Sequence, residues 1–306
     1  MFDLVVGVVQ NLFLAFYNFG YAVSHPADWL NWSDSTALVR FIYYGASSEF
    51  FYVVVATFIV VTAIGLWRRR FLWGVVAVME GFSNGVGRVF AWAGLIMVLQ
   101  QIVIVFLQRI FRVSEISIGP FGYVVTKDLS WYAEELKLYN AIIVCLCCAY
   151  TFVQGGHVRV DLFYAGVRFR TKRIIDMFGS LFFIVPVMAI VWMYGWFFLW
   201  RHLVTPKISA SDKLELLERK ARLLKWNVET IGFSPNGFNG YFLFKVLLVG
   251  FAGMMFIQGV AYFYRSLLEF IEGEGSANRN LDRDSAAETD ALASAGQASG
   301  APAGST

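Results

Sequence analysis

The chain has 306 residues, of which 58% are hydrophobic and 15% are charged, and its formal net charge is +3. A mean hydropathy of +0.59 is far above that of a soluble domain, so the composition predicts an integral membrane protein. The small net charge gives no indication of a nucleic-acid partner, and none is expected. The three cysteines lie together within 145–148 in one apolar run, where we expect packed side chains rather than a disulfide framework or a metal site.

Residues 1–70 are predicted to form an N-terminal extension with one or two membrane helices. Residues 4–24 carry no charge and are long enough to cross a bilayer. However, Gln10, Asn11 and Asn18 interrupt the apolar run, so a spanning helix and a helix in the membrane interface both stay open.

The next two segments are predicted to differ in their relation to the membrane. Residues 50–67 are apolar and stop at three arginines, Arg68 to Arg70, as a spanning helix with a cytoplasmic end does. Residues 71–87 contain Glu80 and other polar residues among large apolar ones, which predicts a separate amphipathic helix along the membrane surface. The Gly81-x-x-x-Gly85 spacing within it is a weak packing signal.

Residues 88–272 are predicted to form a four-span helical domain. In the third span, Pro186 removes a backbone donor, and Trp192, Trp196 and Trp200 read as an interfacial anchor. Lys245, at the start of the fourth span, is expected to extend toward water along the helix. The four spans are expected at 89–108, 138–156, 177–200 and 246–264.

Two polar segments complete the predicted organisation. Residues 211–226 repeat leucine and alanine at helical spacing and carry charged pairs four residues apart, which predicts an extramembrane amphipathic helix capped by Ser211. Residues 273–306 are rich in Ala, Ser, Gly and Asp, so we expect a disordered tail. The predicted fold class is therefore an all-α integral membrane protein with a four-span core, one or two N-terminal membrane helices and amphipathic interfacial helices.

One motif stands where the second core span leaves the hydrocarbon. His157, Arg159 and Asp161 alternate with valines directly after two glycines. Such charged side chains can fix a helix exit by hydrogen bonds to a loop or a partner, which we favour over catalysis or metal binding because no further ligands accompany them. No nucleotide-binding loop or nucleophile motif is present, and no catalytic residue, metal or cofactor is expected.

The run from Glu134 to Asp161 resembles the small membrane (DctQ-like) subunit of tripartite ATP-independent periplasmic (TRAP) transporters, in which a membrane helix beginning near a Glu leads into an H-V-x-V-D-like motif. The residues that carry the resemblance are Glu135 or its neighbour Glu134, together with His157, Arg159 and Asp161. It covers about residues 88–272, and residues 1–87 are an addition to the common short form.

The resemblance implies a small permease subunit that braces a large translocating membrane subunit. A periplasmic solute-binding protein would deliver an organic acid or related solute, and a sodium gradient would drive uptake across the bacterial inner membrane. The basic loops at 68–88 and 159–173 favour a cytoplasmic location for their side and for the C-terminus. An alternative is an anchor or electron-transfer subunit of another membrane complex that uses His25, His157 and His202.

Overall fold

The computed structural model describes residues 2–118, 125–155, 166–230, 237–277, 279, 281 and 282. Most of these residues are helical, and six helices are long and apolar enough to cross a membrane. The protein is therefore an all-α, multi-pass membrane protein, as predicted. The long helices run α1 (Phe2–Ser24), α4 (Ser48–Trp67), α5 (Arg69–Val105), α6 (Leu129–Gln154), α8 (Phe169–Gly179), α9 (Val185–Trp200) and α11 (Tyr241–Glu272).

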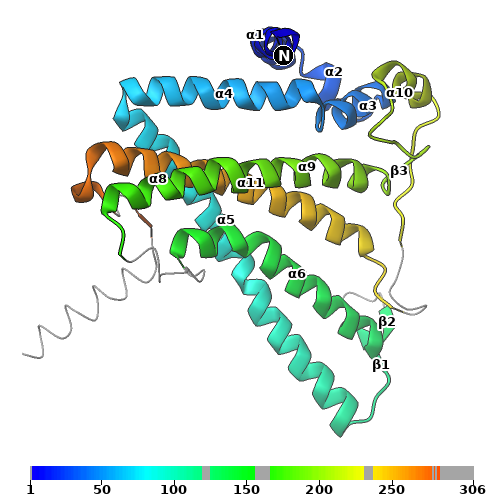
Figure 1. Ribbon diagram of the computed structural model, residues 1–306. Helices are drawn as coiled ribbons and strands as arrows, with labels where there is room; N and C mark the ends of the chain where they lie inside the picture. The colour runs from blue at the N-terminus through cyan, green and yellow to red at the C-terminus, as the bar shows by residue number, and fades with distance from the viewer. Residues whose placement is uncertain are drawn as a thin grey trace, which may run out of the picture.

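Shorter elements lie between the long helices. Two small antiparallel pairs of strands, β1 with β2 and β3 with β4, flank the spans at one end of the bundle (Figure 1). The short elements are α2 (Ala27–Leu30), α3 (Ser35–Tyr44), the π-helical turns η1 (Phe106–Ile110) and η3 (Ser180–Ile184), β1 (Glu115–Ile118), β2 (Val125–Asp128), β3 (Val204–Thr205), α10 (Leu214–Ala221), β4 (Lys225–Trp226) and the 3₁₀ turn η4 (Glu274–Ser276).

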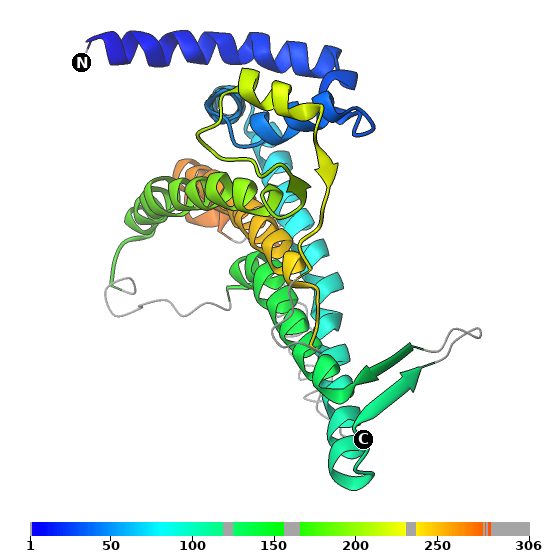
Figure 2. The same ribbon diagram turned by 90° about the vertical axis from the view of Figure 1, so that its right-hand side faces the viewer.

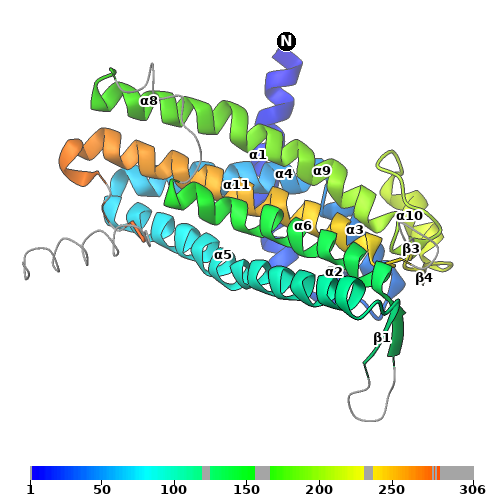
Figure 3. The same cartoon turned by 90° about the horizontal axis from the view of Figure 1, so that it is seen from below.

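The helices α4, α8 with α9, and α11 run side by side, while α5 crosses behind them. The second half of α5 and the first half of α6 extend beyond the other spans as an arm (Figures 1 and 3). Helix α11 lies at the centre, since it contacts α5, α6, α8 and α9 and buries far more of its surface than any other span. The apolar core thus forms around α11. Helix α4 of the N-terminal extension reaches it through its second half, where Phe58 and Thr62 contact Tyr264 of α11.

The prediction of a separate surface helix at 71–87 was wrong. Helix α5 is continuous from Arg69, and with η1 it extends over 42 residues, or about 63 Å at 1.5 Å per residue. No proline interrupts it, and its buried face includes Trp73, Glu80 and Asn84. The polar residues that suggested a water-exposed face point into the protein instead.

The helix predicted at 211–226 is shorter than expected. It runs only from Leu214 to Ala221, and Ser211 does not cap it. The chain leaves the helix because Lys225 and Trp226 pair with β3 as a strand. Glu218, from one of the predicted charged pairs of this helix, accepts a hydrogen bond from Arg40 of α3 at 3.0 Å.

The third core span begins earlier than predicted, at Phe169, and Pro186 stands at its middle. The π-helical turn η3 comes directly before this proline. Proline cannot donate to the carbonyl four residues earlier, and a widened turn is a known way for a helix to accommodate the missing donor. The helix is therefore irregular beside Pro186, where the sequence predicts a missing backbone donor.

Candidate functional site

The motif residues His157, Arg159 and Asp161 lie outside the described residues. The helix that leads into them, α6, ends at Gln154 and is closed by Gly155, whose φ of +73° is the left-handed conformation typical of a helix C-terminus. Glu134 and Glu135, at the other end of α6, are described, and the structure separates their roles.

Glu135 faces α5, while Glu134 faces the segment before α11. The Glu135 carboxylate accepts a hydrogen bond from Gln100 Nε2 at 3.1 Å, so one of the amides near the middle of the first core span does meet another helix. The Glu134 carboxylate accepts the backbone N–H of Phe238 at 2.9 Å. Both acids therefore hold the start of α6 in place, each against a different neighbour.

At the opposite end of the bundle, a buried network of ion pairs joins α5, α8 and α11. Arg265 of α11 makes a two-pronged pair with Glu80 of α5, with N···O distances of 2.6 and 2.5 Å. Arg173 of α8 lies 2.6 Å from Glu269 of α11 and 3.0 Å from Asp176. Glu80 and Glu269 are 3% and 1% exposed, so the charges are almost fully withdrawn from solvent. Charges in this setting persist only when they are paired, which they are here.

The first residues of the predicted tail also join this network. The backbone carbonyl of Arg279 accepts a hydrogen bond from Arg265 at 3.0 Å. Asp282 accepts hydrogen bonds from Asn84 and Arg88 of α5, and its carbonyl accepts one from Gln154 of α6. The prediction of a disordered tail from residue 273 onward was therefore wrong for these residues. Residues 283–306 lie outside the described part.

A second polar contact joins the N-terminal extension to the core. The indole N–H groups of Trp192 and Trp196 in α9 donate to the carbonyls of Gly45 and Ile42, each at 2.9 Å. These carbonyls lie at the C-terminal end of α3, where the last carbonyls of a helix have no hydrogen-bond donor within the helix. A side chain at Gly45 would collide with Trp196. Trp192 and Trp196, predicted as part of an interfacial anchor, thus bind the C-terminal end of α3.

The ion pair between α3 and α10 reinforces this attachment. The Arg40 guanidinium donates a hydrogen bond to the Glu218 carboxylate, which raises the pKa of Arg40. Around it, α3, α9 and α10 share one apolar cluster that includes Ile42, Trp200 and Leu217. The extension is therefore packed into the core domain through α3.

Lys245 was predicted to extend toward water, but it is buried. Its residue is 3% exposed, and its ammonium group lies 4.9 Å from the ring centres of both Phe198 and Tyr241. These distances permit cation–π attraction, which stabilises a positive charge away from water.

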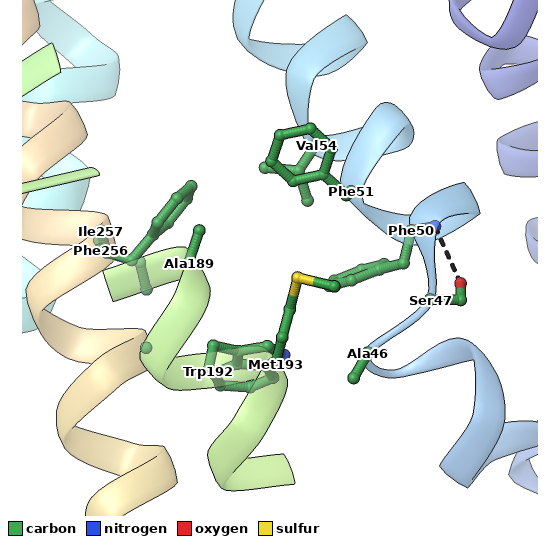
Figure 4. Close-up of a pocket in the computed structure, with 11 residues that line it drawn as sticks. Ala46, Ser47, Phe50, Phe51, Val54, Ala189, Trp192, Met193, Phe256 and Ile257 are labelled. Atoms are coloured by element: carbon green, nitrogen blue, oxygen red, sulfur yellow. Dashed lines mark hydrogen bonds between the residues drawn. The ribbon is translucent and has the colours of Figure 1, made fainter. Parts of the chain in front are cut away.

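A pocket of about 220 Å³ lies between α4 of the extension and helices α9 and α11 (Figure 4). Ser47 is the one hydroxyl-bearing residue in its lining, and its Oγ accepts the backbone N–H of Phe50 to cap α4. The other lining side chains are apolar or offer only the indole of Trp192, which is bound to Gly45. This pocket suits an apolar group and offers no partner for a carboxylate. It is lined by Ala46, Ser47, Phe50, Phe51, Val54, Ala189, Trp192, Met193, Gly253, Phe256 and Ile257.

Within the described residues, no group of three or more His, Cys, Asp or Glu side chains could hold a metal ion. The two described histidines contact nearby backbone carbonyls: His25 Nδ1 lies 3.2 Å from the Tyr21 carbonyl and His202 Nδ1 lies 2.7 Å from that of Phe198. His202 also lies 3.4 Å from Glu229.

Comparison with known families gives one match. Residues 121–215 match the model of the family described as tripartite ATP-independent periplasmic transporters, DctQ component. The matched segment covers α6, α8 and α9 and reaches the start of α10. The matched segment is similar to the DctQ component, and the matched family is one of transporter components rather than of enzymes. Comparison with curated proteins and with solved structures returned no match.

Proposed function

We propose that this DctQ-like chain is the small permease subunit of a sodium-coupled TRAP transporter and braces a large translocating subunit. The family match at 121–215 is the observation that carries the proposal. In this assignment a periplasmic solute-binding protein delivers an organic acid or related solute, and the complex lies in the bacterial inner membrane with the C-terminus of this chain cytoplasmic.

The internal contacts fit a bracing role. The buried charged side chains of Glu80, Arg265 and Glu269 pair with one another. The pocket between α4 and α9 is apolar. Buried charges that pair within a chain fix the relative positions of its helices, whereas a solute carboxylate would need donors of its own.

The second half of α5 has an exposed apolar surface. From Val89 onward, this half exposes a series of large apolar side chains, of which Val89 and Trp92 are 65% and 66% exposed. This part of α5 extends with α6 away from the other spans (Figure 2). We propose that the arm, together with Glu135 and the motif residues His157, Arg159 and Asp161, contacts the large subunit.

Reconstitution tests the function directly. The chain should copurify with the large subunit, and the three components together should take up solute only with a sodium gradient. This chain alone should show no uptake in liposomes. Sodium-driven uptake by the chain alone would overturn the bracing role.

The motif can be tested in the same assay. Asp161→Ala should weaken the complex or its uptake because a charged hydrogen bond is lost, at a cost of about 1–3 kcal/mol. The neighbouring Val158→Ala is the matched control and should have a smaller effect. A normal complex with Asp161→Ala would remove the motif from the partner contact.

A further inference from the structure

Helix α1 runs crosswise to the spans. In Figure 1 it is seen end-on above α4, which lies lengthwise, and in Figure 2, turned by 90°, α1 lies lengthwise. It crosses the half of α4 nearer to α3. With 20 residues, α4 is about 30 Å long, which is the thickness of the hydrocarbon core, so its α3 end lies close to one membrane surface.

The covered side of α1 carries Leu12 and otherwise small or polar residues. Helix α1 contacts α4, and its least exposed residue is Ala15, at 1%. Asn18 and Ala22, at helical spacing from Ala15, are also partly covered. Small side chains let two helices approach closely at a crossing.

The two flanks of α1 differ in chemistry. One flank carries Gln10, Tyr17, Tyr21 and Ser24, all exposed, and the exposed Phe13 and Leu14 lie at its edges. The opposite flank carries Val9, Phe16, Phe19 and Val23, at 45%, 56%, 56% and 64% exposure and also at helical spacing. A helix with one polar and one apolar flank, and with no charge on the apolar one, is the type that lies in a membrane interface.

The contacts of α2 show which way the polar flank faces. Tyr21 Oη donates to Asp28 in α2 at 3.2 Å, and Trp29 Nε1 donates to the carbonyl of Ala22 at 2.9 Å. Helix α2 lies beside α1, toward α3 and α10 (Figure 1). The polar flank therefore faces the end of the bundle where α10 and the strands lie. The apolar flank faces the other way, toward the middle of the spanning helices.

We propose that α1 lies in the membrane interface on the α3 and α10 side, with its apolar flank in the lipid and its polar flank at the headgroups. The partner of this surface is the lipid bilayer itself. Five helical segments then cross the membrane, and the N-terminus is on the same side as α10. A spanning α1 would instead place Gln10 in lipid without a partner and the N-terminus on the opposite side.

Cysteine labelling decides between the two sides. In a chain whose own cysteines are replaced, Asp3→Cys should react with an impermeant maleimide from the same membrane side as Lys220→Cys, with only background labelling from the side that labels Arg170→Cys. Labelling of Asp3→Cys together with Arg170→Cys would show a spanning α1 and overturn the proposal.

A nitroxide scan of the full chain in phospholipid bilayers tests the orientation of the flanks. The neighbouring positions 9 and 10, 16 and 17, and 23 and 24 are matched pairs, since the members of each pair lie at nearly the same height along the helix. Collisions with a water-soluble nickel complex should be more frequent at 10, 17 and 24, and collisions with oxygen more frequent at 9, 16 and 23.

The other outcomes of the scan contradict the proposal. A spanning α1 would give similar values within each pair and a steady change of depth from 9 to 24. Protection of both flanks from both reagents would show that another protein surface, rather than lipid, covers α1.

Discussion

At the scale of single residues, the buried ion pair between Glu80 and Arg265 gives the most specific prediction about stability. Both residues are buried, and the guanidinium meets the carboxylate through two parallel hydrogen bonds. Removing one member of such a pair leaves the other charged and without compensation. Leaving one buried charge unpaired therefore costs more free energy than the intact pair contributes to stability.

Glu80→Ala should therefore lower the free energy of unfolding by about 3–5 kcal/mol, measured by thermal or denaturant unfolding of the purified chain. Replacing both residues, as Glu80→Leu with Arg265→Leu, should restore part of that loss because no unpaired charge remains. Glu274→Ala, at an exposed acid near the same end, is the control and should change stability by at most about 0.5 kcal/mol. A Glu80→Ala variant as stable as this control would contradict the buried pair.

At the scale of helices, the packing of α5 on α6 depends on a glycine that the sequence pattern did not single out. Gly81 and Gly85, whose spacing suggested a helix contact, have open space where a side chain would be. Gly87 instead lies against Tyr150 of α6, and a side chain at position 87 would collide with that tyrosine. Spacing alone cannot tell which glycine faces a neighbour, because this depends on where the other helix crosses.

The two glycines predict opposite effects of the same substitution. Gly87→Ala should destabilise the chain by about 1–3 kcal/mol, since Tyr150 must move to make room. Gly85→Ala should be neutral or stabilising by up to about 1 kcal/mol, because alanine favours the helix and meets nothing. Melting temperatures of the two variants in the same detergent measure the difference. Equal shifts would mean that α5 and α6 are not in close contact at Gly87.

The sequence was most informative about the helices and least informative about their partners. Within the described residues, a long helix covers each run that was predicted as a core span, because long uncharged runs leave few alternatives. The burial of Glu80 and the attachment of Trp196 to α3 were not predicted, because each depends on a residue more than 150 positions away. Glu134 and Glu135 looked equivalent in the sequence, and their different neighbours distinguish them.

At the scale of the whole molecule, the first residues after α11 pack back onto three of the long helices. Arg279 and Asp282 contact α5, α6 and α11 through Arg265, Asn84, Arg88 and Gln154. The start of the tail therefore belongs to the folded unit.

Two truncations separate this docked part from the rest. Removing residues 284–306 leaves every described contact in place and should not change the melting temperature. Removing residues 276–306 also removes Arg279 and Asp282 and should lower it, because Arg265 and Asn84 lose acceptors, at about 1–3 kcal/mol for each buried donor left unpaired. Identical melting temperatures for both truncations would show that these contacts contribute nothing to stability.

The attachment of α3 to α9 also constrains the order of events during synthesis. The Ile42 carbonyl and the Trp196 indole that caps it are 154 residues apart in the chain. At about 5–20 residues per second, the ribosome needs roughly 8–30 s to make this stretch after α3 has emerged. Throughout that interval the last turn of α3 must rely on water or on another protein for its hydrogen bonds. Nascent chains arrested before residue 192 should consequently expose α3 to protease, and chains arrested after α9 has left the ribosome should protect it.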